Sequence, residues 1–279
     1  MVDIVISRYV TMKIIYSFCN LLFIMLLTLL ESGCNKIEEH SKIPSPNVKI
    51  IAHRGYWNTS GGAENSISSL KNAGELGIYG TEFDVWMTKD ENLVVCHDEN
   101  FCGMTIYNTD FVELRNPIYT LSNGEVLPSI DDYLCIAQNY PNLHLVIEFK
   151  SSNSQVYNIK GVELLYDAIC KYEVKDRVDF ISFSIDACML MREIDPEIII
   201  EYLGNDHTIE DLAQKGISGI DFNYSILLDN PDYIYQAHSL GMFVNSWTVN
   251  SSKYAEQLVE MGVDMITTDK PESLNNFFY

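Results

Sequence analysis

The sequence contains few basic residues and many acidic ones. Its 18 lysines and arginines stand against 39 aspartates and glutamates, which gives a formal net charge of −21 at pH 7. Nucleic-acid-binding proteins neutralise phosphates with clusters of Lys and Arg, so this composition argues against nucleic acid as a partner. It still allows a small phosphate-containing substrate, provided that a local cationic site exists. Nothing in the sequence predicts a protein partner.

The sequence also lacks the cysteine spacing typical of zinc sites or disulfide frameworks. Of its seven cysteines, Cys19 lies in an apolar N-terminal run and Cys34 follows that run. The remaining five are odd in number and include no CxxC pair: Cys96, Cys102, Cys135, Cys170 and Cys188. Because most of them lie in apolar strand or helix contexts, we expect buried free thiols.

Long apolar runs are rare, and the one near the N-terminus covers residues 14–30. It is preceded by Lys13 and followed by Ser32 and Gly33, an order typical of a secretory signal. It is too short and too weakly flanked for a transmembrane anchor. Ser32-Gly33-Cys34 resembles the lipobox of bacterial lipoproteins, although Glu31 stands where Leu is usual. We therefore interpret residues 1–34 as a lipoprotein-type signal peptide, with an ordinary signal peptide cut nearby as the alternative.

Residues 35–47 are polar and contain two prolines, so we expect a flexible tether that lifts a domain off a membrane. With Cys34 lipidated, the protein would be anchored in the bacterial cell envelope, facing either the periplasm or the cell surface. Residues 48–279 show no second linker, repeat or low-complexity segment, which indicates one domain.

Short apolar strands alternate with amphipathic helices along this domain. The predicted strands cover residues 48–53, 79–86, 143–149, 178–184, 198–203, 219–222, 242–248 and 263–267. The predicted helices cover residues 66–76, 130–139, 156–172, 187–194, 209–215, 231–239 and 253–261. Eight strands separated by helices predict an α/β fold of the closed (β/α)8 type, a TIM barrel.

One strand-like segment, 93–97, breaks this alternation because the few residues after Trp86 are too short for a crossover helix. We predict a short antiparallel hairpin after the second strand, with its turn near Asp90 and Glu91. Such a hairpin would place His97 roughly opposite Asp84.

Charged residues gather at the predicted C-terminal ends of the strands, where barrel enzymes keep their active sites. Glu82 and Asp84 are two residues apart on one strand, so both should face the barrel interior, and Glu148 ends the next strand. Three carboxylates this close would repel one another. A divalent cation resolves the repulsion, and an all-oxygen ligand set favours Mg²⁺ or Ca²⁺. The alternative is a salt-bridge cluster with Arg54 and Lys150.

Two histidines accompany these carboxylates, His53 at the end of the first strand and His97 on the hairpin. Cleavage of a phosphodiester needs a base for the nucleophile and an acid for the leaving oxygen, and imidazoles serve both roles near neutral pH. We expect His53 to be the base and His97 the acid. Arg54 and Lys150 should hold the non-bridging phosphate oxygens, and Trp247 should line the substrate pocket. Asn65 either caps the first helix or hydrogen-bonds near the metal site.

Nine segments together resemble the glycerophosphodiester phosphodiesterase family. They run in order from about Lys49 to Pro271: Ala52-His53-Arg54-Gly55, Glu64-Asn65-Ser66, Glu82-Phe83-Asp84-Val85, Thr88-Lys89-Asp90, Val94-Val95-Cys96-His97-Asp98, Glu148-Phe149-Lys150, Ser182-Phe183-Ser184, Trp247-Thr248-Val249-Asn250 and Ile266-Thr267-Thr268-Asp269-Lys270-Pro271. The resemblance implies a TIM barrel with a divalent metal on Glu82, Asp84 and Glu148. It also implies that His53 and His97 are the acid and base.

The expected activity is metal-dependent hydrolysis of glycerophosphodiesters to an alcohol and sn-glycerol 3-phosphate. Residues 100–109 stand where the family usually has an Arg-Thr stretch, so the identity of the alcohol is open. Two other functions remain as alternatives. One is a related phospholipase of the phosphatidylinositol or sphingomyelin type, and the other is a catalytically silent barrel that binds phosphorylated ligands.

Overall fold

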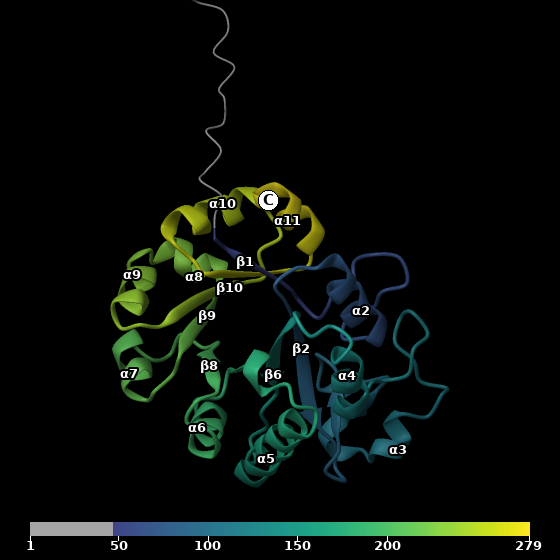
Figure 1. Ribbon diagram of the computed structural model, residues 1–279. Helices are drawn as coiled ribbons and strands as arrows, with labels where there is room; N and C mark the ends of the chain where they lie inside the picture. The colour runs from purple at the N-terminus through teal and green to yellow at the C-terminus, as the bar shows by residue number, and fades with distance from the viewer. Residues whose placement is uncertain (1–46) are drawn as a thin grey trace, which may run out of the picture. The chain divides into compact units, whose positions relative to one another are not determined.

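The computed structural model of the protein describes residues 47–279, and the barrel fold predicted for this part is confirmed (Figure 1). The predicted signal peptide and all but the last residue of the predicted tether lie outside the described residues. Between residues 47 and 279, none of the helices combines the length and apolar character needed to cross a bilayer.

Eight parallel strands form the barrel, and the sheet closes because the first strand pairs with both the second and the last. Around the barrel the order is β1, β11, β10, β9, β8, β7, β6 and β2. Their bounds agree with the predicted strands to within one or two residues: β1 Lys49–Ala52, β2 Gly80–Met87, β6 His144–Phe149, β7 Val178–Ser182, β8 Ile199–Tyr202, β9 Gly219–Asn223, β10 Phe243–Trp247 and β11 Met265–Thr268.

Helices surround these strands, as Figure 1 shows. The seven predicted helices are present, and their bounds are α2 Ile67–Leu76, α4 Ile130–Ala137, α5 Gln155–Lys171, α6 Ile185–Ile194, α7 Ile209–Gln214, α9 Asp232–Ser239 and α10 Ser252–Met261. Three helices were not predicted: α3 (Phe111–Leu114), α8 (Tyr224–Asp229) and α11 (Pro271–Phe278). All three are short, with four, six and eight residues, which is too few for a clear helical period in the sequence.

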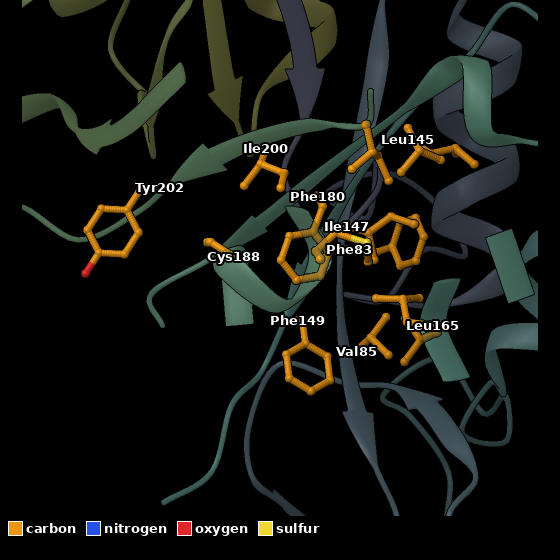
Figure 2. Packing of buried hydrophobic residues seen from close by; sticks show 14 of the residues in the cluster. Phe83, Val85, Leu145, Ile147, Phe149, Leu165, Phe180, Cys188, Ile200 and Tyr202 are labelled. Carbon is orange, nitrogen blue, oxygen red and sulfur yellow. The ribbon is translucent and has the colours of Figure 1, made fainter. Parts of the chain in front are cut away.

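The core between strands and helices is built from the outward-facing residues of the strands (Figure 2). Phe83 and Val85 of β2 are fully buried there, and Leu165 of α5 and Cys188 of α6 belong to the same cluster. Since side chains alternate along a strand, burying these residues outside the barrel turns the residues between them inward. The same alternation that fills the core therefore directs Glu82 and Asp84 into the barrel.

The predicted hairpin is also present, with β3 (Leu93–Val95) antiparallel to β2. The register pairs Val85 with Val95, and the backbone N–H of Cys96 donates to the carbonyl of Asp84. Cys96, rather than His97, is thus opposite Asp84, and His97 lies one residue beyond. The hairpin leads into a segment with β4 (Asn100–Phe101), β5 (Met104–Thr105), the 3₁₀ turn Ile106–Asn108 and α3 (Phe111–Leu114). A second 3₁₀ turn, Lys175–Arg177, precedes β7.

The five cysteines of the described residues are free, as expected, but the prediction that they are mostly buried was wrong. Cys188 is buried and Cys96 is partly buried, whereas Cys102, Cys135 and Cys170 are exposed. Cys135 and Cys170 belong to amphipathic helices, where apolar neighbours in sequence do not determine which face a residue occupies.

Candidate active site

A cavity of about 240 Å³ opens among the C-terminal ends of the strands. It is lined by seven of the predicted site residues: His53, Arg54, Glu82, His97, Glu148, Lys150 and Trp247. The eighth, Asp84, is buried beside the cavity, and its Oδ1 atom lies 2.8 Å from Lys150 Nζ. The barrel thus brings together residues that are spread over almost 200 positions of sequence.

Glu82, Asp84 and Glu148 form the acidic part of this site. The register of β2 and β6 places Asp84 directly beside Glu148. Each of the three residues offers a carboxylate oxygen, and these oxygens lie within 4.8 Å of one another. All three side chains are buried, so each loses hydration that would otherwise stabilise its charge.

The electrostatics of the cluster reflect this burial. Burial, with Asp84 and Glu148 nearby, raises the pKa of Glu82 well above its ordinary range. Burial also raises the pKa of Glu148 to about 7. Burial alone would raise the pKa of Asp84 as well, but Lys150 and His97 lower it to about 2.

The predicted cationic partners are close to this cluster. Lys150 Nζ lies 2.7 Å from Glu148 in addition to its contact with Asp84, and these two carboxylates raise the pKa of Lys150 despite its burial. The Arg54 guanidinium lies 3.9 Å from Asp84 and pairs more closely, at 2.6 Å, with Glu64. One buried lysine and one shared arginine do not fully compensate three carboxylates. A group of oxygen ligands with excess negative charge fits a hard divalent cation.

Asn65 does not cap the first helix, because Ser66 is the N-cap of α2. The Asn65 side-chain amide instead donates to Asp84 Oδ2 at 2.7 Å. Its backbone adopts a left-handed conformation, with φ of 58°, which asparagine tolerates better than most residues. Of the two sequence-based interpretations, the structure supports the one near the carboxylate cluster.

Each histidine has a carboxylate at Nδ1. His53 Nδ1 lies 2.8 Å from Asp269 Oδ1, and Asn250 Nδ2 donates to the other oxygen of Asp269 at 2.6 Å. His97 Nδ1 lies 2.7 Å from Asp98 Oδ1. Such contacts orient an imidazole and leave Nε2 to exchange a proton with a substrate. The His97 side chain is 38% exposed against 17% for His53.

The pKa of His97 reflects its position between opposite charges. Burial lowers this pKa, Asp84 opposes the shift, and the cations Lys150 and Arg54 lower it further. Burial would raise the pKa of Asp269, but hydrogen bonds from His53 and Asn250 lower it, so this carboxyl is charged at neutral pH.

Trp247 forms part of the cavity wall. Its indole N–H donates to the backbone carbonyl of Asp221 at 2.9 Å, and its ring packs edge-on against Phe183 with ring centroids 5.7 Å apart. These two contacts fix the indole against the wall. A fixed aromatic surface at the mouth of a cavity is suited to packing against the carbon atoms of a small ligand.

Comparison with known proteins identifies the family. Residues 53–273 match the model of the glycerophosphoryl diester phosphodiesterase family. The chain belongs to this family. A glycerophosphodiester phosphodiesterase from Caldanaerobacter subterraneus subsp. tengcongensis is 30% identical over 246 residues, covering 81% of this chain and 96% of that protein. Members of the family are phosphoric diester hydrolases, and the chain is an enzyme of this class.

Solved structures agree with the assignment to this family. A glycerophosphodiester phosphodiesterase from Parabacteroides distasonis is 39% identical, with a TM-score of 0.81, covering 84% of this chain and 97% of that one. A phosphodiesterase from Oleispira antarctica, solved with the product sn-glycerol-3-phosphate, is 24% identical with a TM-score of 0.72 and covers 82% of this chain and 95% of that one. The second likeness supports the fold alone.

Several residues of the site were not predicted from the sequence. Asp98 and Asp269 belong to segments that carry the family resemblance, but their contacts with His97 and His53 were not foreseen. Asp221, which lines the cavity, was also missed. A signal existed for Asp221, since an acidic residue within an apolar strand near its C-terminal end is a candidate site residue in a barrel.

Proposed function

We propose that this enzyme hydrolyses glycerophosphodiesters to an alcohol and sn-glycerol 3-phosphate with the help of a divalent cation. The observation that carries the proposal is the convergence of three buried carboxylates, two histidines and two cationic side chains on one cavity. This set supplies a metal site, acid–base groups and charge compensation for a phosphodiester. No single member of the set is specific, but their combination meets each requirement of the reaction.

Glu82, Asp84 and Glu148 would hold Mg²⁺ or Ca²⁺, the hard cations that prefer oxygen ligands. When bound, the cation would compensate the negative charge of the phosphate and stabilise charge that develops during cleavage. The family to which the chain belongs and the buried acidic triad both support a divalent cation at this position. Adding Mg²⁺ or Ca²⁺ separately to the metal-free enzyme, and measuring which ion restores activity, distinguishes the two cations.

His53 and His97 would transfer the protons. We assign the base to His53, whose Nδ1 faces the anchored carboxylate of Asp269. We assign the acid to His97, which is the more exposed of the two and is better placed to protonate an alcohol that leaves toward solvent. Because the pKa of His97 is lowered, its protonated form would depend on the negative charge of the bound phosphate.

Arg54 and Lys150 would hold the non-bridging phosphate oxygens, since both cations line the cavity. Trp247 would pack against the carbon atoms of the substrate. The base would activate either a water molecule or the glycerol hydroxyl next to the phosphate, the latter giving a cyclic phosphate that water opens later. A substrate without that hydroxyl separates these routes, because normal cleavage excludes the cyclic one.

We also propose that the enzyme works at the bacterial cell envelope, anchored through a lipid on Cys34. The support is the sequence before the barrel, with its apolar run, its lipobox-like Ser32-Gly33-Cys34 and its polar tether. A tether of this kind would hold the cavity above the membrane, within reach of water-soluble diesters.

A product assay tests the proposed function. Purified protein is incubated with glycerophosphocholine, glycerophosphoethanolamine and glycerophosphoglycerol, and sn-glycerol 3-phosphate is measured by an enzyme-coupled reaction. We expect release from at least one of them, loss of release in EDTA and recovery with Mg²⁺ or Ca²⁺. Glu82→Gln, Asp84→Asn and Glu148→Gln should lose activity while the barrel stays folded. Full activity after exhaustive metal removal would contradict the cation requirement.

A further inference from the structure

Asp221 is a buried carboxyl group within the active-site cavity that the proposed acid–base and metal chemistry does not use. It lies in the middle of β9, is 1% exposed and lines the cavity together with His53, Glu148 and Trp247. Its Oδ1 atom is buried and has no hydrogen-bond partner among residues 47–279. A buried carboxyl oxygen without a donor is costly, so its retention at a binding cavity points to a ligand.

The order of the strands places Asp221 across the barrel from the metal-binding carboxylates. Going around the sheet from β2 in either direction, β9 is the fourth strand, so β9 and β2 face each other through the interior. Glu82 and Asp84 belong to β2. Glu148 belongs to the neighbouring strand β6, and Lys150 follows that strand directly. A substrate whose phosphate lies at β2 would therefore extend its other end toward β9.

The wall around Asp221 differs in character from the wall around the carboxylate cluster. The cavity is lined there by Ile181 of β7, by Leu203 directly after β8 and by Trp247 of β10. The Trp247 indole is tied to the Asp221 backbone carbonyl, which fixes both residues relative to each other. The result is a buried carboxyl group beside a mostly apolar wall, which suits a short carbon chain that ends in a hydroxyl.

We propose that Asp221 recognises the glycerol moiety of the substrate by binding its terminal hydroxyl. This inference rests on the proposed function, because it takes a glycerophosphodiester as the substrate. The hydroxyl next to the phosphate stays near the histidines, whereas the terminal one is a carbon further away and reaches across the cavity. A quaternary ammonium headgroup has no N–H to donate, so it would leave Asp221 Oδ1 unpaired.

This assignment makes Asp221 a specificity residue. A site built to hydrogen-bond a hydroxyl discriminates against the analogue that lacks it, because the buried polar group is then left without a partner. Asp221 would therefore select a glycerol diester over the diester of a simpler diol, while the rest of the cavity performs the same chemistry on both.

The test compares two phosphocholine diesters on the full-length enzyme. The first is glycerophosphocholine, and the second contains propane-1,2-diol, which keeps the hydroxyl next to the phosphate and lacks the terminal one. Wild-type enzyme should prefer the glycerol diester by about 10- to 100-fold in kcat/KM, the range expected for one hydrogen bond to a buried carboxyl. Asp221→Ala should bring this ratio close to one, and Asp221→Asn, which keeps an acceptor oxygen, should retain most of it.

Glu201→Met is the matched control. Glu201 lies on the adjacent strand β8, is fully buried and has both carboxyl oxygens unpaired within the described residues, but it does not line the cavity. This variant should keep the wild-type ratio. Circular dichroism melting verifies that each variant is folded, and Asp221→Val replaces the alanine variant if that one is unstable.

The outcomes separate the two proposals. If wild-type enzyme is active but Asp221→Ala keeps the wild-type ratio, or if the control loses the ratio equally, the role of Asp221 is wrong and the proposed function stands. Asp221→Ala could instead lose activity on glycerophosphoethanolamine while keeping activity on glycerophosphoglycerol. In that case Asp221 binds a cationic alcohol and the inference is overturned. If wild-type enzyme cleaves no glycerophosphodiester, the proposed function fails and the inference fails with it.

Discussion

Asn65 and Asp84 are joined by two hydrogen bonds that run in opposite directions. The amide nitrogen of Asn65 donates to Asp84 Oδ2 at 2.7 Å, and the backbone N–H of Asp84 donates to Asn65 Oδ1 at 3.1 Å. One side chain therefore fixes both the position and the orientation of a proposed metal ligand. Groups that orient ligands in this way contribute substantially to metal affinity.

Replacing Asn65 should therefore weaken metal binding while leaving the three carboxylates in place. We expect Asn65→Gly to raise the Mg²⁺ or Ca²⁺ concentration for half-maximal activity by about 10- to 100-fold. Glycine accepts the left-handed backbone at this position, so the loss would come from the amide rather than from strain. Metal titration of activity is the measurement. An unchanged half-maximal concentration would show that Asp84 is held adequately by Lys150 alone.

The two histidines should be distinguishable by the leaving group. His53→Ala and His97→Ala should each lose about 10²- to 10⁴-fold in rate, the usual contribution of a positioned proton-transfer group. A nitrophenyl diester of glycerol phosphate needs little protonation of its leaving oxygen. It should therefore restore the rate of His97→Ala and not that of His53→Ala. The opposite pattern would exchange the two roles, and near-normal turnover by either variant would remove that residue from the mechanism.

The wild-type pH profile should be bell-shaped, since one histidine must be neutral and the other protonated. Because the pKa of His97 is lowered, the basic limb of kcat/KM for the free enzyme should fall at a lower pH than an ordinary histidine would give. His97→Ala should lose this limb on the nitrophenyl substrate. A basic limb that persists in the variant would assign the limb to another group.

Glu201 should destabilise the folded protein at neutral pH. Burial, and then Asp179 and Asp221, raise its pKa well above the ordinary value. A carboxyl whose pKa is higher in the folded state favours folding only while it is protonated. That contribution is therefore lost as pH rises from the unfolded-state pKa toward the folded-state one. Glu201→Met should increase the free energy of unfolding by about 1–3 kcal/mol at pH 8, with a smaller gain near pH 4. Urea denaturation at the two pH values tests this, and a loss of stability at pH 8 would contradict it.

Lipidation of Cys34 has a simple test in a bacterial host. Wild-type protein should partition with membranes and carry a modified Cys34 at its mature N-terminus, as mass spectrometry of the N-terminal peptide can determine. Cys34→Ser should be processed differently and should lose the lipid. Mature wild-type protein found free in solution and starting at another residue would favour the ordinary signal peptide.

The barrel and the main site residues could be predicted because their signals are local. Alternation along β2 fixes the direction of Glu82 and Asp84 from the apolar residues between and beside them. The ends of successive parallel strands meet at one face, so His53 and Glu148 could be placed together without knowing any contact.

Other features could not be predicted, because they depend on which segments meet in three dimensions. Asp269 contacts His53 across 216 positions of sequence, and no spacing rule links the two. The exposed positions of Cys135 and Cys170 depend on how α4 and α5 rotate against the barrel. The unpaired oxygen of Asp221 became visible only when every neighbour of the cavity was known.

The closure of the barrel at β1 has a consequence for when activity arises during synthesis. β1 completes its pairing only when β11, near the C-terminus, is present, and Asp269 follows that strand directly. A growing chain therefore carries His53 early but cannot orient it until β11 and Asp269 have left the ribosome. Contacts between such distant segments also form slowly in folding. Premature termination anywhere before the last strand should thus yield no partially active fragment.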